Sequence, residues 1–269
     1  MIRQLTEKDR TLVMDFAGER PAENLFILGD IETFGFGGEP VMVWGDFNET
    51  GALISILLRY RDNFIPYAKH PDQLDGEAWS EVIKNNGKLR MLSGLKEMVE
   101  RILPFIGQPP QDRKLCFYAK REDREVLDKE SMRKDVKMLF PEEADKIVRL
   151  RASIPEFSEP KVDPADFQEN MEKGISRTYY IEKNEEPVSA VSTTAETRRA
   201  AMIVGVCTKP GYKRRGYATS CLIKTIAALK AEHKEPCLFY NNPEAGSIYK
   251  KLGFEDIDQW MMASYRKIS

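Results

Sequence analysis

Three consecutive cations precede a glycine in the segment KPGYKRRGYATS, residues 209–220. The cations are Lys213, Arg214 and Arg215, and the glycine is Gly216. A glycine lets an anion approach the main chain closely, and the neighbouring cations supply the opposite charge. The segment therefore suits one or two phosphate groups, whereas the alternative, a solvated basic turn, needs no ligand.

The sequence on either side of the cations indicates a strand that leads into a helix. Residues 200–208, AAMIVGVCT, are apolar and β-branched, which predicts a buried strand that turns sharply at Pro210. Beyond Gly216, apolar residues recur at helical spacing as far as Leu229, which predicts an amphipathic helix of about four turns. Cations at a helix amino terminus oppose the helix dipole unless an anion is bound. A bound pyrophosphate would turn this repulsion into attraction.

A second helix, which contains a tyrosine, is expected over residues 243–253, PEAGSIYKKLG. Asn242 is its expected cap, Pro243 takes its first position, and Gly253 ends it. Tyr249 lies on its predicted apolar face, so it is either a core residue or a general acid. A neutral phenol suits the second role because it still holds a proton near neutral pH.

Together the two segments resemble the signature of the GCN5-related N-acetyltransferase (GNAT) superfamily. In that family a strand ending in V-x-T-x-P leads through an (R/Q)-x-x-G-x-(G/A) loop, here Lys213 to Ala218, into a helix. Lys213 departs from the pattern and lacks the planar fork of an arginine. Residues 241–254 match N-x-x-A-x-x-x-Y-x-x-x-G-F. The resemblance is strongest to the FR47-like subgroup and covers about residues 135–269.

The resemblance implies acetyl-CoA-dependent transfer of an acetyl group to a primary amine, by direct attack in a ternary complex. It implies that Tyr249 protonates the leaving thiolate, that the loop binds the pyrophosphate of acetyl-CoA, and that the strand end binds the pantetheine arm. The residues assigned to the cofactor are Val206, Cys207, Thr208, Lys213, Arg214, Arg215, Gly216, Tyr217, Ala218, Thr219 and Asn242. An acyl-enzyme on Cys207 is the runner-up mechanism, although no histidine neighbours it in the sequence.

Acetyl transfer also needs a group that removes the amine proton, because alkylamines are mostly protonated at pH 7. Glu196, at the end of the strand before residues 200–208, is the candidate base, and a solvated turn residue is the alternative. Arg198 and Arg199 beside it form either a charged turn or a site for an acidic substrate.

The expected elements occur in the same order in both halves of the chain, as in a duplicated and diverged unit. We expect helices at 7–19, 21–35, 75–87, 95–103, 141–154, 163–174, 215–233 and 243–253, and strands at 2–5, 41–47, 52–60, 63–69, 88–92, 114–120, 176–184, 187–196, 200–208, 236–242 and 254–267. This order predicts an α/β fold with mixed sheets and helices on their faces, arranged as two tandem GNAT-like domains.

The domains are expected at residues 1–121 and 135–269, joined by a charged linker at 122–134. A solvated helix within one domain is the alternative for the linker. Acidic residues, including Asp75 and Glu77, surround Gly76 in the first half and would repel a pyrophosphate. The first domain is therefore expected to be degenerate and not to bind CoA.

Composition excludes several other classes. The net charge of −2 argues against a nucleic-acid binder, and two histidines with four scattered cysteines argue against a metal site. Apolar runs are too short to span a membrane and no signal peptide is evident, so we expect a cytoplasmic protein with reduced, buried thiols. The expected partner is a small-molecule or peptide amine. The sequence leaves the oligomeric state open between a monomer and a homodimer. Rival interpretations are a CoA-binding regulator without turnover and a nucleic-acid partner that uses the cations.

Overall fold

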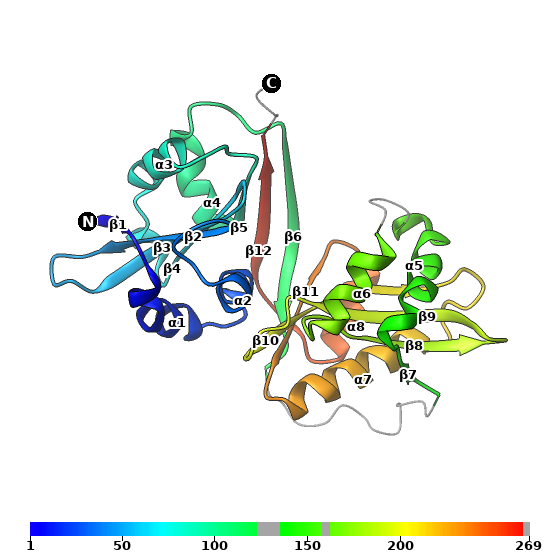
Figure 1. Cartoon of the computed structure of the whole chain (residues 1–269). Helices are drawn as coiled ribbons and strands as arrows, with labels where there is room; N and C mark the ends of the chain where they lie inside the picture. Colours follow the sequence, from blue (N-terminus) through cyan, green and yellow to red (C-terminus); the bar gives the residue numbers. More distant parts are fainter. Residues whose placement is uncertain (123–134, 158–161, 266–269) are drawn as a thin grey trace. The chain divides into compact units, whose positions relative to one another are not determined.

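The computed structural model of the chain describes residues 1–122, 135–157 and 162–265. The chain divides into two compact units, Met1–Tyr118 with Asp256–Ser269, and Ala119–Glu255 (Figure 1). Both units combine helices with a mixed sheet, which confirms the predicted α/β class. The predicted linker, residues 122–134, lies outside the described residues except for Glu122.

The first unit contains a sheet with the strand order β1-β2-β3-β4-β5-β12-β6. Its strands are β1 (Ile2–Gln4), β2 (Val41–Phe47), β3 (Leu53–Tyr60), β4 (Asn63–Ala68), β5 (Met91–Leu95), β6 (Asp112–Lys120) and β12 (Glu255–Ser264). Its helices are α1 (Arg10–Gly18), α2 (Leu25–Phe34), α3 (Gly76–Asn85) and α4 (Lys96–Ile102). The β4–β5 pair is parallel, whereas β1 to β4 pair antiparallel in sequence order.

Strand β12 belongs to the first unit, although it follows the whole of the second unit in the sequence. It pairs antiparallel with β5, with Trp260 opposite Leu95. The Trp260 ring lies 5.2 Å from the ring of Phe26 and 5.7 Å from that of Tyr118. The compact units therefore differ at this end from the expected domains, which assigned residues 254–267 to the second, because the apolar face of β12 is buried against the first unit.

The second unit contains a sheet with the strand order β11-β10-β9-β8-β7. Its strands are β7 (Lys137–Met138), β8 (Thr178–Lys183), β9 (Glu186–Thr194), β10 (Ala200–Thr208) and β11 (Glu235–Tyr240). Its helices are α5 (Ala144–Ala152), α6 (Pro164–Glu172), α7 (Tyr217–Ala231) and α8 (Pro243–Lys251). Neighbouring strands are antiparallel except for the parallel β10–β11 pair. Helices α5 and α6 cover one face of the sheet and α7 covers the other (Figure 1).

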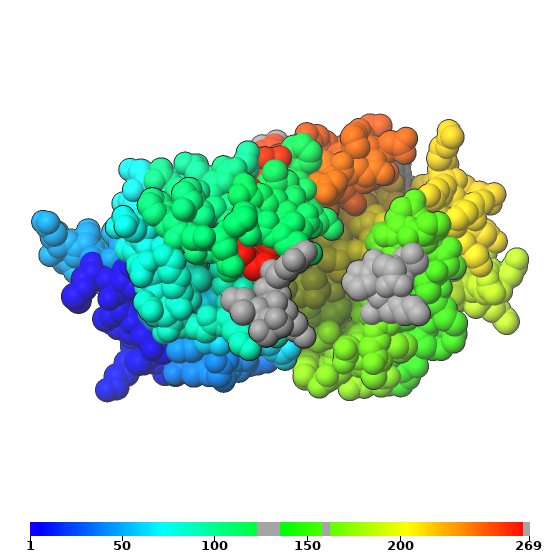
Figure 2. Space-filling model, turned by 90° about the horizontal axis from the view of Figure 1, so that it is seen from above, coloured from blue at the N-terminus to red at the C-terminus, as the bar shows by residue number. Residues whose placement is uncertain are grey.

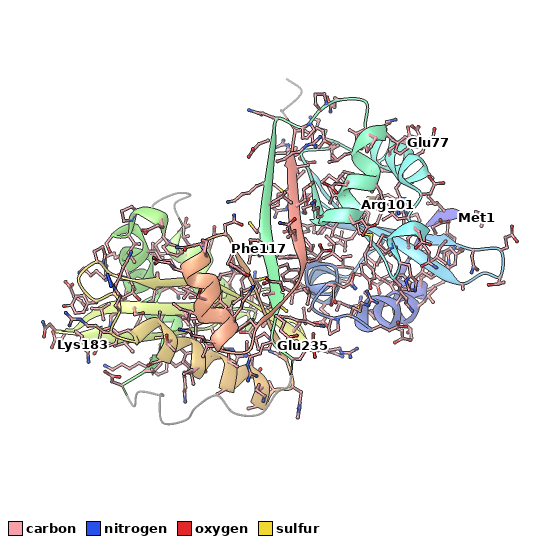
Figure 3. The ribbon with its side chains drawn as sticks, turned by 180° about the vertical axis from the view of Figure 1, so that it is seen from behind. Met1, Glu77, Arg101, Phe117, Lys183 and Glu235 are labelled. Atoms are coloured by element: carbon pink, nitrogen blue, oxygen red, sulfur yellow. The ribbon has the colours of Figure 1, made fainter. Side chains whose placement is uncertain are left out.

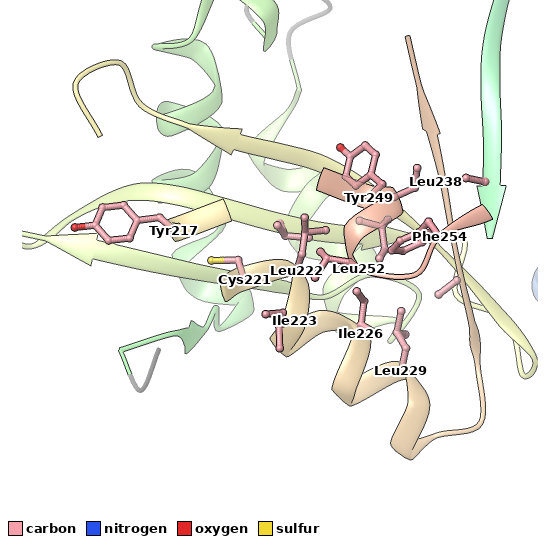
Figure 4. Packing of buried hydrophobic residues seen from close by; sticks show 14 of the residues in the cluster. Tyr217, Cys221, Leu222, Ile223, Ile226, Leu229, Leu238, Tyr249, Leu252 and Phe254 are labelled. Carbon is pink, nitrogen blue, oxygen red and sulfur yellow. The ribbon is translucent and has the colours of Figure 1, made fainter. Parts of the chain in front are cut away.

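The apolar face of α7 holds its amino terminus in place. Leu222, Ile226 and Leu229 are fully buried against the sheet, together with residues of α8 (Figure 4). Burying each such side chain stabilises the fold by about 1.5–3 kcal/mol. The four cysteines, Cys116, Cys207, Cys221 and Cys237, are buried and free, as expected.

The amino terminus of α3 takes the place in the first unit that corresponds to the cation loop in the second. Contacts within the protein close this helix end to a ligand. The Asp75 side chain accepts a hydrogen bond from the Ala78 amide at 3.0 Å and caps the helix. A methyl group at Gly76 would collide with the Arg101 carbonyl oxygen, so the first turn packs against backbone. Figure 3 labels Glu77 on α3 and Arg101 on α4. The Ala78 amide, one of the first donors of α3, is therefore already bonded within the protein.

Candidate functional site

A cavity of about 500 Å³ lies in the second unit, beside the part of β10 that extends beyond its pairing with β11. The parallel pairing runs from Ala200 to Ile203, whereas β10 continues to Thr208. The ladder between β10 and β9 also shifts register between Val204 and Cys207, as in a β-bulge. The backbone of β10 beyond Ile203 is therefore free of its β11 neighbour and forms one wall of the cavity.

Most of the residues predicted to bind the cofactor line this cavity. They are Val206, Cys207, Thr208, Lys213, Arg214, Gly216, Tyr217, Ala218, Thr219 and Asn242. Arg215 is the exception, because its guanidinium lies over the Tyr212 ring, 5.3 Å from the ring centre. The loop between β10 and α7 projects at the surface of the unit (Figure 2, yellow, at the right).

The amino terminus of α7 reaches the cavity without a side-chain cap. Gly216 is its N-cap residue, with φ 77° in the left-handed region that glycine adopts without strain. The first backbone N–H groups of a helix have no partner within the helix, so α7 presents donors and the positive end of its dipole. Helix α8 differs, because the Asn242 side chain accepts a hydrogen bond from the Glu244 amide at 2.9 Å.

Tyr249 lies on α8 and also lines the cavity. Its ring packs edge-on against Tyr240 at 5.7 Å and Phe254 at 6.0 Å, and burial raises its pKa to about 12. Within the described part of the chain, no hydrogen bond to its hydroxyl is present. The hydroxyl points away from Leu252 and Phe254 (Figure 4). The phenol is thus protonated, and its hydroxyl has no hydrogen-bond partner among the described residues.

Cys207 lines the cavity, but it is buried in the cluster formed with α5 and α6, on the face of the sheet opposite α7. Burial raises the pKa of its thiol to about 11. A thiol with this pKa is protonated at neutral pH, and only the thiolate is an effective nucleophile. The acyl-enzyme mechanism is therefore disfavoured.

Glu196 lies away from the cavity, near the start of β10 and not near its end. Its side chain is fully buried and accepts two hydrogen bonds from Arg177, at 2.8 and 2.5 Å, and one from Lys234 at 2.9 Å. Burial raises the pKa of Glu196, but the hydrogen bonds outweigh burial and leave the pKa below its ordinary value. An ionised carboxylate held by two cations is a weak base, so this placement gives the predicted base role no geometric support.

The free energy of unfolding is expected to fall in acid because of this ion cluster. Hydrogen bonding to Arg177 lowers the pKa of Glu232 from 4.5 to about 2, and the pKa of Glu196 is lowered too. Carboxylates with depressed folded-state pKa values stabilise fully above their unfolded pKa and lose this stabilisation as pH falls. Urea unfolding between pH 7 and 3 should show a decline beginning near pH 4.5. The decline should be shallower in Glu196→Gln, and identical profiles for the two proteins would contradict the assignment.

Several residues that line the cavity were not predicted, because no sequence motif indicates them. Ile154 and Phe157 follow α5, and Glu156 between them forms a 3.5 Å ion pair with Lys213. Glu156 lies 57 positions before Lys213, and the local sequence of these residues resembles an ordinary helix end. A contact between segments so far apart is set by tertiary packing.

Two further features concern the described residues as a whole. In residues 1–122, 135–157 and 162–265, no group of three histidine, cysteine or acidic side chains is arranged to hold a metal ion. Over the same ranges, every helix is too short or too polar to cross a membrane.

Comparison with known proteins places this geometry in a family. The GNAT acetyltransferase family model matches residues 104–262, and no curated protein matches. A GCN5-related N-acetyltransferase from Sphaerobacter thermophilus has a TM-score of 0.61 at 11% identity, over 97% of this chain and 94% of that chain. An acetyltransferase of the GNAT family from Colwellia psychrerythraea has a TM-score of 0.56 at 11% identity, over 99% and 100%.

A tandem GNAT protein from the clavulanic acid biosynthesis pathway is similar along the whole chain. Its TM-score is 0.52 at 13% identity, over 100% of this chain and 99% of that chain. At such identities the structural likeness concerns the fold alone, and it agrees with the predicted tandem architecture. The family rests on the sequence match, and because that match spans more than half of the residues, the chain belongs to the GNAT acetyltransferases.

Proposed function

We propose that the second unit binds acetyl-CoA and transfers its acetyl group to a primary amine, by direct attack in a ternary complex. The observation that carries the proposal is that one cavity is lined by the amino terminus of α7, which has no side-chain cap, by the part of β10 that has no partner on its β11 side, and by Tyr249. Within the family, the motif at residues 241–254 favours the FR47-like subgroup. The free buried thiols favour a reducing compartment, and we propose the cytoplasm.

In this proposal the pyrophosphate of acetyl-CoA binds at the first turn of α7. The backbone N–H groups after Gly216 donate to the phosphate oxygens, and Lys213 and Arg214 supply positive charge. Arg215 is oriented toward Tyr212, so we assign it a lesser contribution. The pantetheine arm lies along Val206 to Thr208, where β10 is unpaired on its β11 side and its backbone can hydrogen-bond to amides.

The acetyl-CoA supplies a thioester, and the chain aligns it with the amine and stabilises the departing thiolate. Alignment of two reactants can contribute about 7–11 kcal/mol to lowering a barrier. Tyr249 has a pKa of about 12, well above the value of about 8.5 for a free thiol, so full proton transfer to the thiolate is unfavourable. We therefore propose that Tyr249 acts by donating a hydrogen bond as the thiolate forms.

The acceptor is a small-molecule or peptide amine, which must lose a proton before or during the attack. Two carboxylates line the cavity, those of Glu156 and Glu244, and either can pass the proton to water. A hydrogen bond from its own backbone and the charge of Lys213, with which it forms an ion pair, lower the pKa of Glu156, so its carboxylate is ionised.

A glycine pair tests the cofactor site. Gly216→Ala should weaken acetyl-CoA binding by roughly 10-fold, because left-handed backbone disfavours a side chain by about 1–2 kcal/mol and the altered turn misplaces the helix donors. Gly211→Ala is the matched control: φ is 84°, a methyl group there also meets open space, and Gly211 does not line the cavity. Both variants should lose similar stability, but only Gly216→Ala should lose affinity in calorimetry.

Thiol release with an amine panel then separates enzyme from regulator. Acetyl-CoA binding with turnover supports the proposal, whereas binding without acetylation of any amine supports a CoA-binding regulator. No binding of acetyl-CoA at millimolar concentration by folded protein would overturn both.

A further inference from the structure

A buried cation lies next to residues that line the cavity, and the described residues provide no counter-ion for it. Arg151, on α5, is only 9% exposed, and its Nη2 donates a hydrogen bond to Ser192 Oγ at 2.7 Å. Its guanidinium lies over the Phe167 ring, 5.1 Å from the ring centre. In the described part of the chain Arg151 has no ion pair, its Nε is buried without an acceptor, and its Nη1 has no acceptor either.

Burying the charge of Arg151 is energetically unfavourable for the protein without a ligand. Burial lowers the pKa of Arg151, and the other contribution comes from the Cys207 thiol, which stays protonated. A guanidinium does not give up its proton in proteins, so Arg151 remains charged. Buried charges are ordinarily paired, because desolvation without compensation is costly. An anion beside the guanidinium would supply the missing counter-charge.

The guanidinium is directed at the bulge of β10, next to the cavity wall. Gly205 has φ 60°, and a methyl group there would collide with the Arg151 guanidinium. The following residue, Val206, lines the cavity, and so does Ile154, one turn after Arg151. Consecutive Cα atoms are about 3.8 Å apart, so the cation lies close to the strand segment that, in the proposed function, holds the arm of acetyl-CoA.

We propose that Arg151 binds a carboxylate of the acceptor, so that the substrates are amines that carry a carboxylate, such as amino acids or short peptides. This inference rests on the proposed acetyl transfer. A planar carboxylate matches the guanidinium fork and its single charge. A phosphate dianion would leave excess negative charge in a site with one buried cation, and a neutral amine would leave the cation unpaired.

Matched acceptors test the inference on the wild-type protein. The common L-amino acids and their carboxamides share a skeleton and differ in the charge of one group. Thiol release with acetyl-CoA should show that kcat/KM for the preferred amino acid exceeds that for its carboxamide by about 10- to 100-fold, the range of a hydrogen bond between charged groups. Calorimetry of both compounds on CoA-saturated protein should show the same preference without turnover.

Two variants test whether the Arg151 guanidinium causes the preference for the amino acid over its carboxamide. Arg151→Gln should reduce the ratio between amino acid and carboxamide to near 1 while leaving the acetyl-CoA affinity unchanged. Arg149→Gln is the control on the same helix, because Arg149 is 70% exposed in its side chain and pairs with Asp145. It should keep the wild-type ratio. If Arg151→Gln does not fold, the comparison of acceptors on wild-type protein decides the inference.

Several outcomes would overturn the inference. One is equal use of amino acid and carboxamide by the wild-type protein, and another is a proportional loss of both in Arg151→Gln. A protein that binds acetyl-CoA but neither binds nor acetylates any amino acid also overturns it and leaves the proposed acetyl transfer intact. Absence of acetyl-CoA binding, by contrast, is the failure of the proposed function itself.

Discussion

Tyr249→Phe is expected to lower kcat for acetyl transfer by about 10²-fold or more, the typical cost of removing one hydrogen-bond donor from a developing anion. The hydroxyl accounts for the effect, because the ring contacts with Tyr240 and Phe254 persist in the variant. Stability should change little, since no hydrogen bond to the hydroxyl is present among the described residues. The measurements are steady-state thiol release and thermal unfolding.

The acetyl-CoA affinity of Tyr249→Phe should stay near the wild-type value, because the hydroxyl is proposed to act when the thiolate forms. Tyr180→Phe is a suitable control: Tyr180 is buried in the cluster with α5 and α6 and does not line the cavity. This control should retain wild-type kcat. If Tyr249→Phe keeps more than half of the wild-type kcat on a confirmed acceptor, Tyr249 is a core residue and the hydrogen-bond role is wrong.

Glu196→Ala is expected to lower the free energy of unfolding by about 3 kcal/mol, the lower end of the range for breaking a buried ion pair. The substitution leaves Arg177 and Lys234 with less counter-charge, and their side chains are only 16% and 15% exposed. Glu232 still pairs with both cations, which limits the loss. Urea unfolding at pH 7 measures the effect.

Glu232→Ala provides the comparison, because Glu232 contacts the same two cations but its side chain is 42% exposed. An exposed ion pair contributes about 1 kcal/mol or less, so Glu232→Ala should lower the free energy of unfolding by no more than this.

The folded Glu196→Ala protein, assayed well below its unfolding temperature, should acetylate its acceptor at the wild-type rate. A large loss of kcat without a loss of stability would instead restore Glu196 as the base.

Local patterns were sufficient for the elements that form the cavity. The apolar run at residues 200–208 is β10, and the helical spacing after Gly216 is α7. Gly216 adopts the left-handed conformation that makes a glycine useful at this turn. These features depend on residues within a few positions of one another, so the sequence expresses them directly.

Contacts between distant segments were not predictable in the same way. Glu196 is 19 positions from Arg177 and 38 from Lys234. Nothing in the sequence near Glu196 indicates that its carboxylate would form ion pairs with these two cations. The strand predicted at 88–92 also begins too early. The amides of Arg90 and Met91 both donate to the one carbonyl of Asp62, so the regular ladder of β5 begins only at Met91.

The placement of β12 in the first unit has a consequence for biosynthesis. The sheet of this unit lacks a strand until residues after 255 leave the ribosome, about 140 positions after Tyr118. At about 5–20 residues per second, the wait is roughly 7–28 s. During this time β5 has an unsatisfied edge, and the nascent first unit is exposed to aggregation or to chaperones before its partner strand arrives.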